Sequence, residues 1–195
     1  MIYADFHIHT TYSPDSSITP KTLIDRLHAH SFIKTIAITD HNTLEGYFKT
    51  KQLASSYQDV LIIPGVEVAT HNGDLILLGI TELPPKPWTL TNVTRYAKEK
   101  DATLIVPHPY RAFGLGDTAK TIQPHAIETL NGVSTLQANK QAQNLAKQMG
   151  LPCVAGSDAH TPDELWTVYN EIQASQNPNE ILKAIRNGSV KIKHL

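Results

Sequence analysis

The chain has 195 residues, of which 41% are hydrophobic and 18% charged, and 17 Lys and Arg against 18 Asp and Glu give a formal net charge of −1. Such scattered cations exclude a protein that holds long nucleic acid by counterion release, and no apolar run is long enough to cross a bilayer. The single cysteine, Cys153, excludes an intrachain disulfide, and the first residues lack a charged leader. We expect one cytoplasmic domain over residues 1–195. The sequence does not predict the oligomeric state.

Short apolar runs rich in β-branched residues alternate with segments of helical period, which is typical of repeated βα units. We expect helices over residues 20–30, 43–57, 91–100, 134–149 and 177–188. We expect strands over residues 2–9, 34–41, 60–68, 75–80, 102–108, 126–132, 152–160, 166–172 and 189–195. A tight turn at 71–74 would make the third and fourth strands a hairpin.

Capping residues mark the ends of two of these helices. Thr19 followed by Pro20 predicts the start of the first helix, because threonine suits the N-cap and proline the first helical position. Ser134 and Gln137 have the spacing of a capping box, and Gly150 predicts the end of the same helix.

Side chains that bind metals occur at the ends of six predicted strands. They are His7 and His9, Asp40 and His41, Glu67, His108, Glu128 and Asn131, and Asp158 and His160. In a (β/α) barrel the carboxyl ends of the strands open onto one mouth, whereas an open doubly wound sheet gathers function near one switch point. One such histidine could belong to a core, but six such strand ends favour an α/β barrel with a metal site at its mouth.

The spacing of His7 and His9 also favours a metal site. Residues two apart in a strand point to the same face, so both rings would project from one spot. Imidazole is costly in an apolar stretch unless its nitrogens are satisfied, and two rings beside a carboxylate suit a divalent cation. A pair of half-exposed histidines at a strand edge is the alternative.

Six motifs in order along the chain resemble the PHP family (polymerase and histidinol phosphatase domain). They are HIHTTYS with Asp15, ITDHNT, PGVEV, HPYR, IETLNG and GSDAH. The resemblance covers nearly the whole chain. It implies a distorted (β/α)7 barrel with up to three divalent metals at the carboxyl ends of its strands, and an enzyme that hydrolyses phosphate esters.

Transferred residue by residue, the resemblance places one metal on His7, His9, Glu67 and Asp158. Asp158 and His160 are again two residues apart, after a predicted strand, which suits a pair of ligands.

The resemblance makes Glu67 a bridge to a second metal, which His108 also binds. It places a third metal on Asp15, His41 and His160. We therefore expect two or three divalent cations. A mixed set of imidazole and carboxylate ligands suits Zn, Mn or Fe(II).

One position departs from the family pattern. Family members often have a histidine in the hairpin strand after the bridging glutamate, where this chain has Asp74 or Ile76, depending on the alignment. Both lie on the same strand face, so Asp74 could supply an oxygen ligand instead. Otherwise the second site is weak or empty. His71 lies in a turn and is expected to be exposed.

Two further carboxylates leave alternatives open. Asp40 could orient an imidazole through its N–H, or it could cap the helix that follows. Glu128 could lie beside the mouth and support a ligand, or it could be polar surface.

No serine, cysteine or lysine is placed as an activated nucleophile, so the expected nucleophile is a hydroxide on a divalent cation. Arg111, three residues after His108, is expected to bind substrate as a bidentate phosphoryl clamp; a surface arginine in a loop is the alternative. The leaving group could be protonated by His160, by His41 or by water.

These residues favour a metal-dependent phosphoesterase acting on small phosphate esters, nucleotides or short oligonucleotides. The alternatives are an amidohydrolase-like C–N hydrolase and a non-catalytic metal-dependent binding module. Amidohydrolases usually have longer chains, with a modified lysine at the metal bridge where this chain has Glu67. A binding module would be expected to have lost ligands.

Overall fold

A computed structural model describes all residues, 1–195. The helices are α1 (Pro20–Ala29), α2 (Glu45–Ala54), α3 (Leu90–Glu99), α4 (Leu136–Met149) and α5 (Pro178–Arg186), with a 3-10 helix at Gly116–Thr121. The strands are β1 (Ile2–Asp5), β2 (Thr35–Ile38), β3 (Leu61–Thr70), β4 (Gly73–Leu78), β5 (Thr103–Val106), β6 (Ala126–Asn131), β7 (Cys153–Gly156), β8 (Val168–Ile172) and β9 (Val190–His194). None of the helices has the length and apolar character needed to span a membrane.

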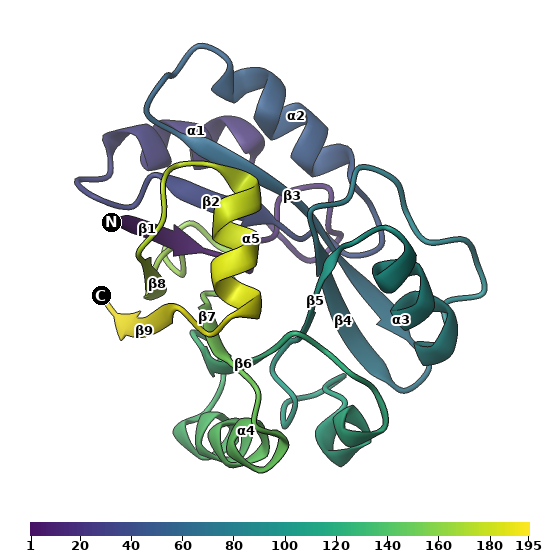
Figure 1. The fold of residues 1–195 in the computed structure, drawn as a ribbon. Coiled ribbons are helices and arrows are strands. Elements are labelled where there is room, and N and C mark those ends of the chain that lie inside the picture. Colours follow the sequence, from purple (N-terminus) through teal and green to yellow (C-terminus); the bar gives the residue numbers. More distant parts are fainter.

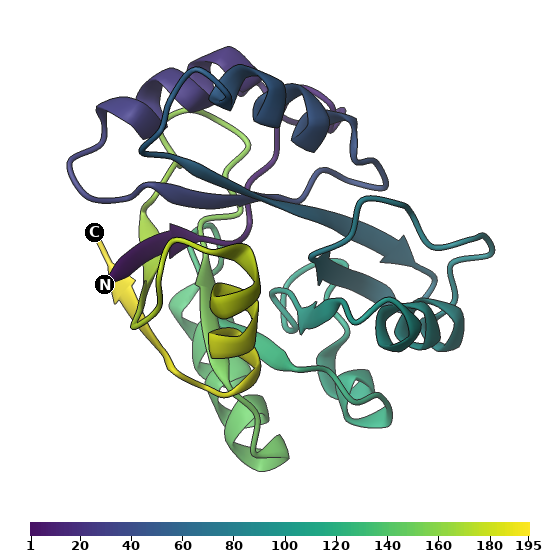
Figure 2. The same cartoon turned by 45° about the horizontal axis from the view of Figure 1, so that its top comes forward.

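All nine strands form one sheet that curls into a nearly closed barrel (Figures 1 and 2). Strands β1 to β7 are neighbours in chain order, and β8 and β9 extend the sheet beyond β1. The two ends of the seven-strand series meet where Ile8 bridges Ala159 in parallel register, just beyond β1 and β7. Below this bridge the buried Asn170 side chain closes the gap, because it hydrogen-bonds the backbone of both Ala4 and Ala155.

The expected (β/α)7 repeat is only partly followed. The sheet has nine strands, and β4 runs antiparallel to both β3 and β5. The hairpin predicted at 71–74 is present, so no helix separates β3 from β4, and a 3-10 helix takes the place of a helix after β5. The barrel architecture is therefore confirmed, whereas a strict repeat of seven βα units is not.

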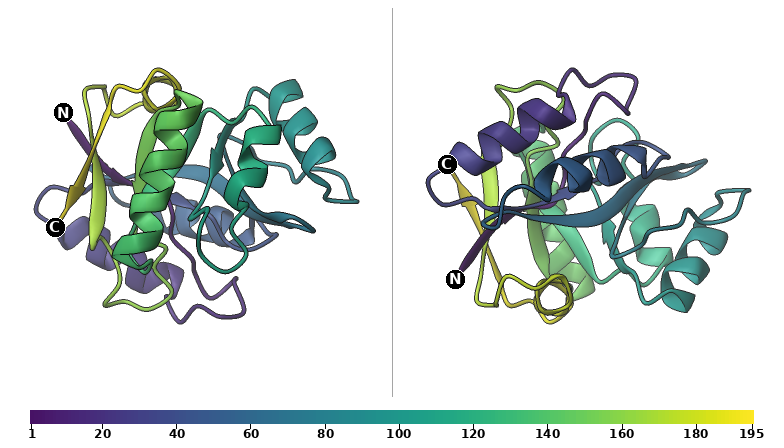
Figure 3. Two further views of the ribbon diagram at one scale, coloured as in Figure 1. Left: turned by 90° about the horizontal axis from the view of Figure 1, so that it is seen from below. Right: turned by 90° about the horizontal axis from the view of Figure 1, so that it is seen from above.

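The interior of the barrel is apolar below the mouth. Eight strands and α5 contribute to one cluster of buried side chains, in which Ile63, Ile76 and Ile105 come from three adjacent strands. Ile181 and Ile185 of α5 belong to the same cluster and are fully buried, so α5 covers the end of the barrel opposite the mouth. Figure 3 shows α5 nearly end-on beside the sheet.

Two further clusters lie between the sheet and the outer helices. α1 and α2 pack side by side over β2 and β3, and α3 and α4 pack against the other half of the sheet (Figures 1 and 3). Of the two predicted N-caps, one is correct. The side chain of Thr19 accepts from the Thr22 N–H at the start of α1, as predicted. The capping box is wrong by one residue, because Thr135 and not Ser134 caps α4.

Candidate metal centre

Four side chains from three segments converge on one buried point. The Nε2 atoms of His7 and His9 lie 3.0 Å apart. His7 Nε2 is 3.3 Å from both Glu67 Oε2 and Asp158 Oδ1, and His9 Nε2 is 3.2 and 3.3 Å from the same two atoms. Donors about 2.0 Å from a tetrahedral cation stand about 3.3 Å from one another. The spacing of these atoms therefore fits a divalent cation at their centre.

The other nitrogen of each ring is already engaged. His7 donates its Nδ1–H to Glu128 Oε1 at 2.9 Å, and His9 donates its Nδ1–H to the Ser13 hydroxyl at 3.0 Å. These bonds fix the tautomer that turns both Nε2 lone pairs toward each other. Two lone pairs at that separation repel unless a proton or a cation lies between them.

Asp40 supports His9 through Ser13. The Ser13 hydroxyl donates to Asp40 Oδ1 at 2.8 Å, and Thr10 donates to the same carboxylate through its N–H and its hydroxyl. The expectation that Asp40 caps the next helix is wrong, because Leu44 occupies the N-cap of α2 and no side chain bonds there. Asp40 instead orients an imidazole, through an intermediate hydroxyl.

A second donor group shares Glu67. Its Oε2 faces His7 and His9, and its Oε1 lies 3.0 Å from His108 Nε2. Asp74 completes this group, while Ile76 belongs to the apolar interior. The structure thus brings the carboxylate of Asp74, and not the side chain of Ile76, beside Glu67 and His108, and metal binding by Asp74 stays a prediction. Burial, with the charge of Glu67, raises the pKa of Asp74 to about 7.

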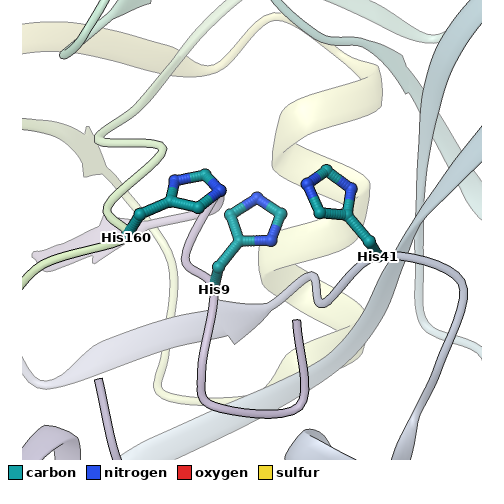
Figure 4. A group of neighbouring side chains, drawn as sticks. All are labelled: His9, His41 and His160. Atoms are coloured by element: carbon teal, nitrogen blue, oxygen red, sulfur yellow. The ribbon is translucent and has the colours of Figure 1, made fainter. Parts of the chain in front are cut away.

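A third group lies at the outer side of the mouth. His9, His41 and His160 come from three separate segments and their rings surround one point (Figure 4). Asp15 Oδ2 is 3.5 Å from Nε2 of both His41 and His160. The Asp15 and His41 side chains are 56% and 26% exposed, so this group is the one open to solvent.

Arg111 reaches the same centre. One of its guanidinium nitrogens pairs with Asp158 Oδ2, the oxygen that points away from His9, and the side chain is 36% exposed. Asn131 also donates to Asp158 Oδ2, at 3.1 Å, and to Glu128 Oε2, at 2.9 Å. Arg111 is exposed and lies in a loop, as the surface-arginine alternative expects, but its guanidinium contacts Asp158; the role of phosphoryl clamp stays a prediction.

Local irregularities of the backbone aim several of these side chains. Phe6 packs in the barrel interior but Ile8 packs against the outer helices, so the strand alternation breaks between them and turns His7 into the mouth. His108 and Asp158 have positive φ angles of 25° and 55°, which few non-glycine residues adopt. Such backbone persists where the surrounding contacts fix it, and it clusters at functional sites.

The histidines and the carboxylates of this site stabilise each other's charged forms. Burial alone would lower the pKa of His9, but hydrogen bonds to Asp158 and Glu67 raise it to about 9. Neighbouring carboxylates likewise raise the pKa of His7. Burial would raise the pKa of Glu67 and of Asp158, but the charge of His7 holds both well below their usual range. A cation bound at this point would therefore compete with protons on the histidines.

All eight predicted metal ligands lie in these three groups, and their binding of metal stays a prediction. The sequence did not mark Ser13 and gave Asn131 no role. Of the two roles left open for Glu128, the structure shows the one beside the mouth, because Glu128 is buried and accepts from His7. A signal existed for Glu128 in the IETLNG motif, at a strand end, but nothing local marks Ser13. His71 is exposed, as expected, and Cys153 is half-buried.

Comparison with protein families agrees with this geometry. The family model described as "PHP domain" matches residues 5–147. This chain belongs to the PHP domain family. A second model, described as "PHP-associated", matches residues 137–190, and strands from both stretches lie in the same sheet.

Known relatives and structures resemble the chain over most of its length. Uncharacterized protein MJ1587 of Methanocaldococcus jannaschii is 31% identical over 163 residues, which cover 74% of this chain and 94% of that protein. An amidohydrolase from Chromobacterium violaceum has a similar structure, with a TM-score of 0.71 at 18% identity over 98% of this chain and 97% of that one. A Bifidobacterium adolescentis protein proposed to be a metal-dependent phosphoesterase has a TM-score of 0.65 at 13% identity, over 80% and 87%.

Proposed function

We propose that this PHP domain protein is a metal-dependent phosphoesterase. Its substrates would be phosphate mono- or diesters of small metabolites, nucleotides or short oligonucleotides, and its cofactors two or three ions of Zn, Mn or Fe. The observation that carries the proposal is the pair of Nε2 atoms of His7 and His9, 3.0 Å apart, with both Nδ1 atoms engaged elsewhere. Such a pair between two carboxylates is built to hold a cation.

Divalent cations bound here would activate water and polarise a phosphoryl oxygen. The residues of the chain then have distinct tasks. Arg111, held by Asp158, would present the rest of its guanidinium to the phosphoryl oxygens as a bidentate clamp. At the mouth, the side chains of Asp15, His41 and Arg111 are 56%, 26% and 36% exposed, so substrate would approach on the side of these residues.

His160 can protonate the leaving group only through one nitrogen. Its Nδ1–H is donated to the backbone carbonyl of Asp158 at 2.8 Å, which leaves Nε2 facing Asp15. That nitrogen can bind a cation or carry a proton, but not both at once. We propose that His160 delivers the proton when two cations are bound, and that a third cation, which His41 would also bind, would pass this task to water.

The related structures support an oxyanion substrate. The Chromobacterium violaceum amidohydrolase was crystallised with sulfate and without metal, and sulfate has the tetrahedral shape and charge of a phosphoryl group. The Bifidobacterium adolescentis protein is described as a proposed metal-dependent phosphoesterase. The amidohydrolase likeness also keeps C–N hydrolysis as the second candidate. A non-catalytic module is disfavoured, because all the expected ligands are retained at the mouth.

A screen of purified protein with added Mn or Zn tests the proposal. The panel contains phosphomonoesters, cyclic and linear phosphodiesters, short oligonucleotides, amides and lactones. We expect hydrolysis of phosphate esters alone, at least two divalent metals per chain by elemental analysis, and loss of both in Asp158→Ala. Asp163→Ala, whose side chain is 98% exposed, is the matched control.

Other outcomes of this screen would contradict the proposal. Hydrolysis of amides or lactones alone would assign the C–N hydrolase. Tight binding of phosphate esters without turnover by any metal form would assign the binding module. A metal content of one or less per chain would exclude the paired-metal site.

A further inference from the structure

Large apolar side chains are exposed around the mouth of the barrel. Apart from the two terminal residues, six are exposed in the whole chain, and four of these lie in segments that follow β1, β5 or β6 at their carboxyl ends. They are Tyr12, Phe113, Val133 and Leu136. Exposed apolar side chains beside a polar site can mark a place where a ligand or partner binds.

Phe113 is the most informative of the four. It is 80% exposed, and its φ angle of 63° lies in the left-handed region that a large side chain rarely adopts. An exposed ring on unfavourable backbone contributes nothing to the core. The ring is therefore free to contact a molecule outside the fold.

The loop that carries Phe113 is firmly held. Within residues 108–116, Arg111 N–H donates to the His108 carbonyl, Gly114 N–H to the Arg111 carbonyl, and Gly116 N–H to the Pro109 carbonyl, at 2.7–3.0 Å. A Cβ on Gly114 would stand 2.4 Å from the His108 carbonyl oxygen, so only glycine allows this tight path. The Phe113 ring is thus presented on a rigid support.

The same loop is tied to the metal centre. The Phe113 carbonyl accepts from the Asp74 N–H at 2.8 Å, while the Asp74 carboxylate faces Glu67 and His108. Phe113 is also two residues from Arg111, whose guanidinium contacts Asp158. The backbone that carries the ring is therefore held at the edge of the mouth, two residues from the residue proposed to bind the phosphoryl group.

We propose that Phe113 stacks on a flat aromatic ring in the alcohol half of the substrate, so that the preferred esters are nucleotides or other aromatic phosphate esters. Arg111 would hold the phosphoryl end and Phe113 the ring end of one ligand. Rings stack on aromatic side chains with little dependence on ring identity. This inference rests on the proposed function and narrows its substrate class.

Paired substrates separate the ring from the phosphoryl group. Adenosine 5′-monophosphate and ribose 5-phosphate share the sugar phosphate and differ in the base. We expect the Mn-loaded protein to prefer the nucleotide in kcat/KM, and Phe113→Ala to lower kcat/KM for the nucleotide about tenfold. The value for ribose 5-phosphate should stay within about twofold. Phe113→Tyr should keep the preference, and Phe48→Ala, at another exposed phenylalanine, should change neither value.

A stability measurement distinguishes a contact from a structural role. Phe113→Gly relieves the positive φ angle, so it should lose the preference for the nucleotide without a lower Tm. A lower Tm together with equal losses on both substrates would overturn the inference. Equal kcat/KM for the two substrates in the unaltered protein would overturn it as well, while leaving phosphoesterase activity intact.

Two other outcomes, the absence of turnover and a role of the ring in self-association, have tests of their own. If neither compound is hydrolysed, equilibrium dialysis of both against the Mn-loaded protein tests the ring directly. Equal binding of both would overturn the inference, and the absence of turnover would count against the proposed function alone. If Phe113→Ala instead abolishes self-association in sedimentation and leaves the substrate preference unchanged, the ring belongs to a protein interface and the inference is wrong.

Discussion

The two ends of the barrel bury opposite kinds of side chain. At one end α5 places Ile181 and Ile185 among the apolar residues of eight strands, while at the other end His7, His9 and Glu67 are just as deeply buried. Burying charged or polar groups is costly unless each has a partner, whereas burying apolar groups is favourable. The apolar end therefore contributes the free energy of folding that offsets the burial of polar and charged side chains at the mouth.

Replacing the shared ligand should have the largest effect. Glu67→Gln keeps the shape of the side chain but removes the charge that faces two donor groups. We expect lower metal content and a loss of at least about 1,000-fold in kcat/KM, beyond the 10- to 100-fold typical of an outer partner. Elemental analysis and steady-state kinetics measure this, with the exposed Glu45→Gln as control. Unchanged metal content would contradict the bridging role.

The opposite end should respond in stability and not in chemistry. Ile185→Ala removes a fully buried side chain beneath the barrel and should cost about 2–5 kcal/mol in the free energy of unfolding. Metal content and kcat/KM at 25 °C should not change. Urea denaturation and elemental analysis of this variant, beside the exposed Lys183→Ala, give the answer. A loss of metal in the folded variant would show that the two ends are not independent.

Arg111→Ala should cost about 2–4 kcal/mol in kcat/KM, because a charge-assisted bidentate contact with the phosphoryl group is lost. Lysine should restore only part, since a point charge cannot replace the planar fork. Metal content should stay the same, because arginine donates no lone pair. Kinetics of both variants, with Arg95→Ala as an exposed control, test this. A change within about twofold would assign Arg111 a structural task.

The Ser13 relay should matter less than the ligands it supports. Ser13→Ala removes the acceptor that fixes the His9 tautomer, so metal affinity should fall about 10- to 100-fold. Asp40→Asn should act in the same direction, because it weakens the acceptor for the Ser13 hydroxyl. Competition with a chelator measures affinity without relying on activity. Ser17→Ala, on the surface of the same loop, should leave affinity unchanged.

Changing pH should give the smallest steps, at most about tenfold in metal affinity per pH unit for each proton released. The pKa of His9 is raised to about 9 in the metal-free protein, so a cation must displace a proton and its affinity should rise as pH increases toward 9. Stability should change in the opposite sense. The contribution of His9 to the metal-free fold is complete below its unfolded pKa near 6.5 and is lost as pH rises to about 9. Calorimetry in buffers of different ionisation enthalpy and denaturation across pH 6–9 check both signs.

Several features of the centre were predictable from local pattern. Strand periodicity predicted that His7 and His9 converge, and they do, although β1 ends at Asp5 and both residues lie beyond it. Glu67 faces the same point, although β3 continues past it to Thr70. Chain order alone carries the rest of the inference, because the carboxyl ends of the parallel strands meet at one mouth.

The choice between Asp74 and Ile76 was not predictable in this way. Both lie on one strand face, and only the pairing of Ile76 opposite Glu67, within the apolar interior, leaves Asp74 beside His108. The role of Asp40 was equally undecided, because a carboxylate before a helix often caps it. Here the hydroxyls of Thr10 and Ser13 donate to that carboxylate, which therefore does not cap the helix.

The sequence by itself determined which side chains occur at the strand ends and therefore which possible metal ligands the mouth contains. Tertiary structure alone decided how they are supported, because the supporting partners are remote in the chain. Glu128 meets His7 across 121 residues, and Asn170 joins β1 to β7 across 166 and 15 residues. It also decided the turn between Phe6 and Ile8 that aims the first histidine, since closing the barrel through Ala159 fixes the direction of Ile8. Contacts of that range depend on how the whole barrel closes, and no local pattern encodes them.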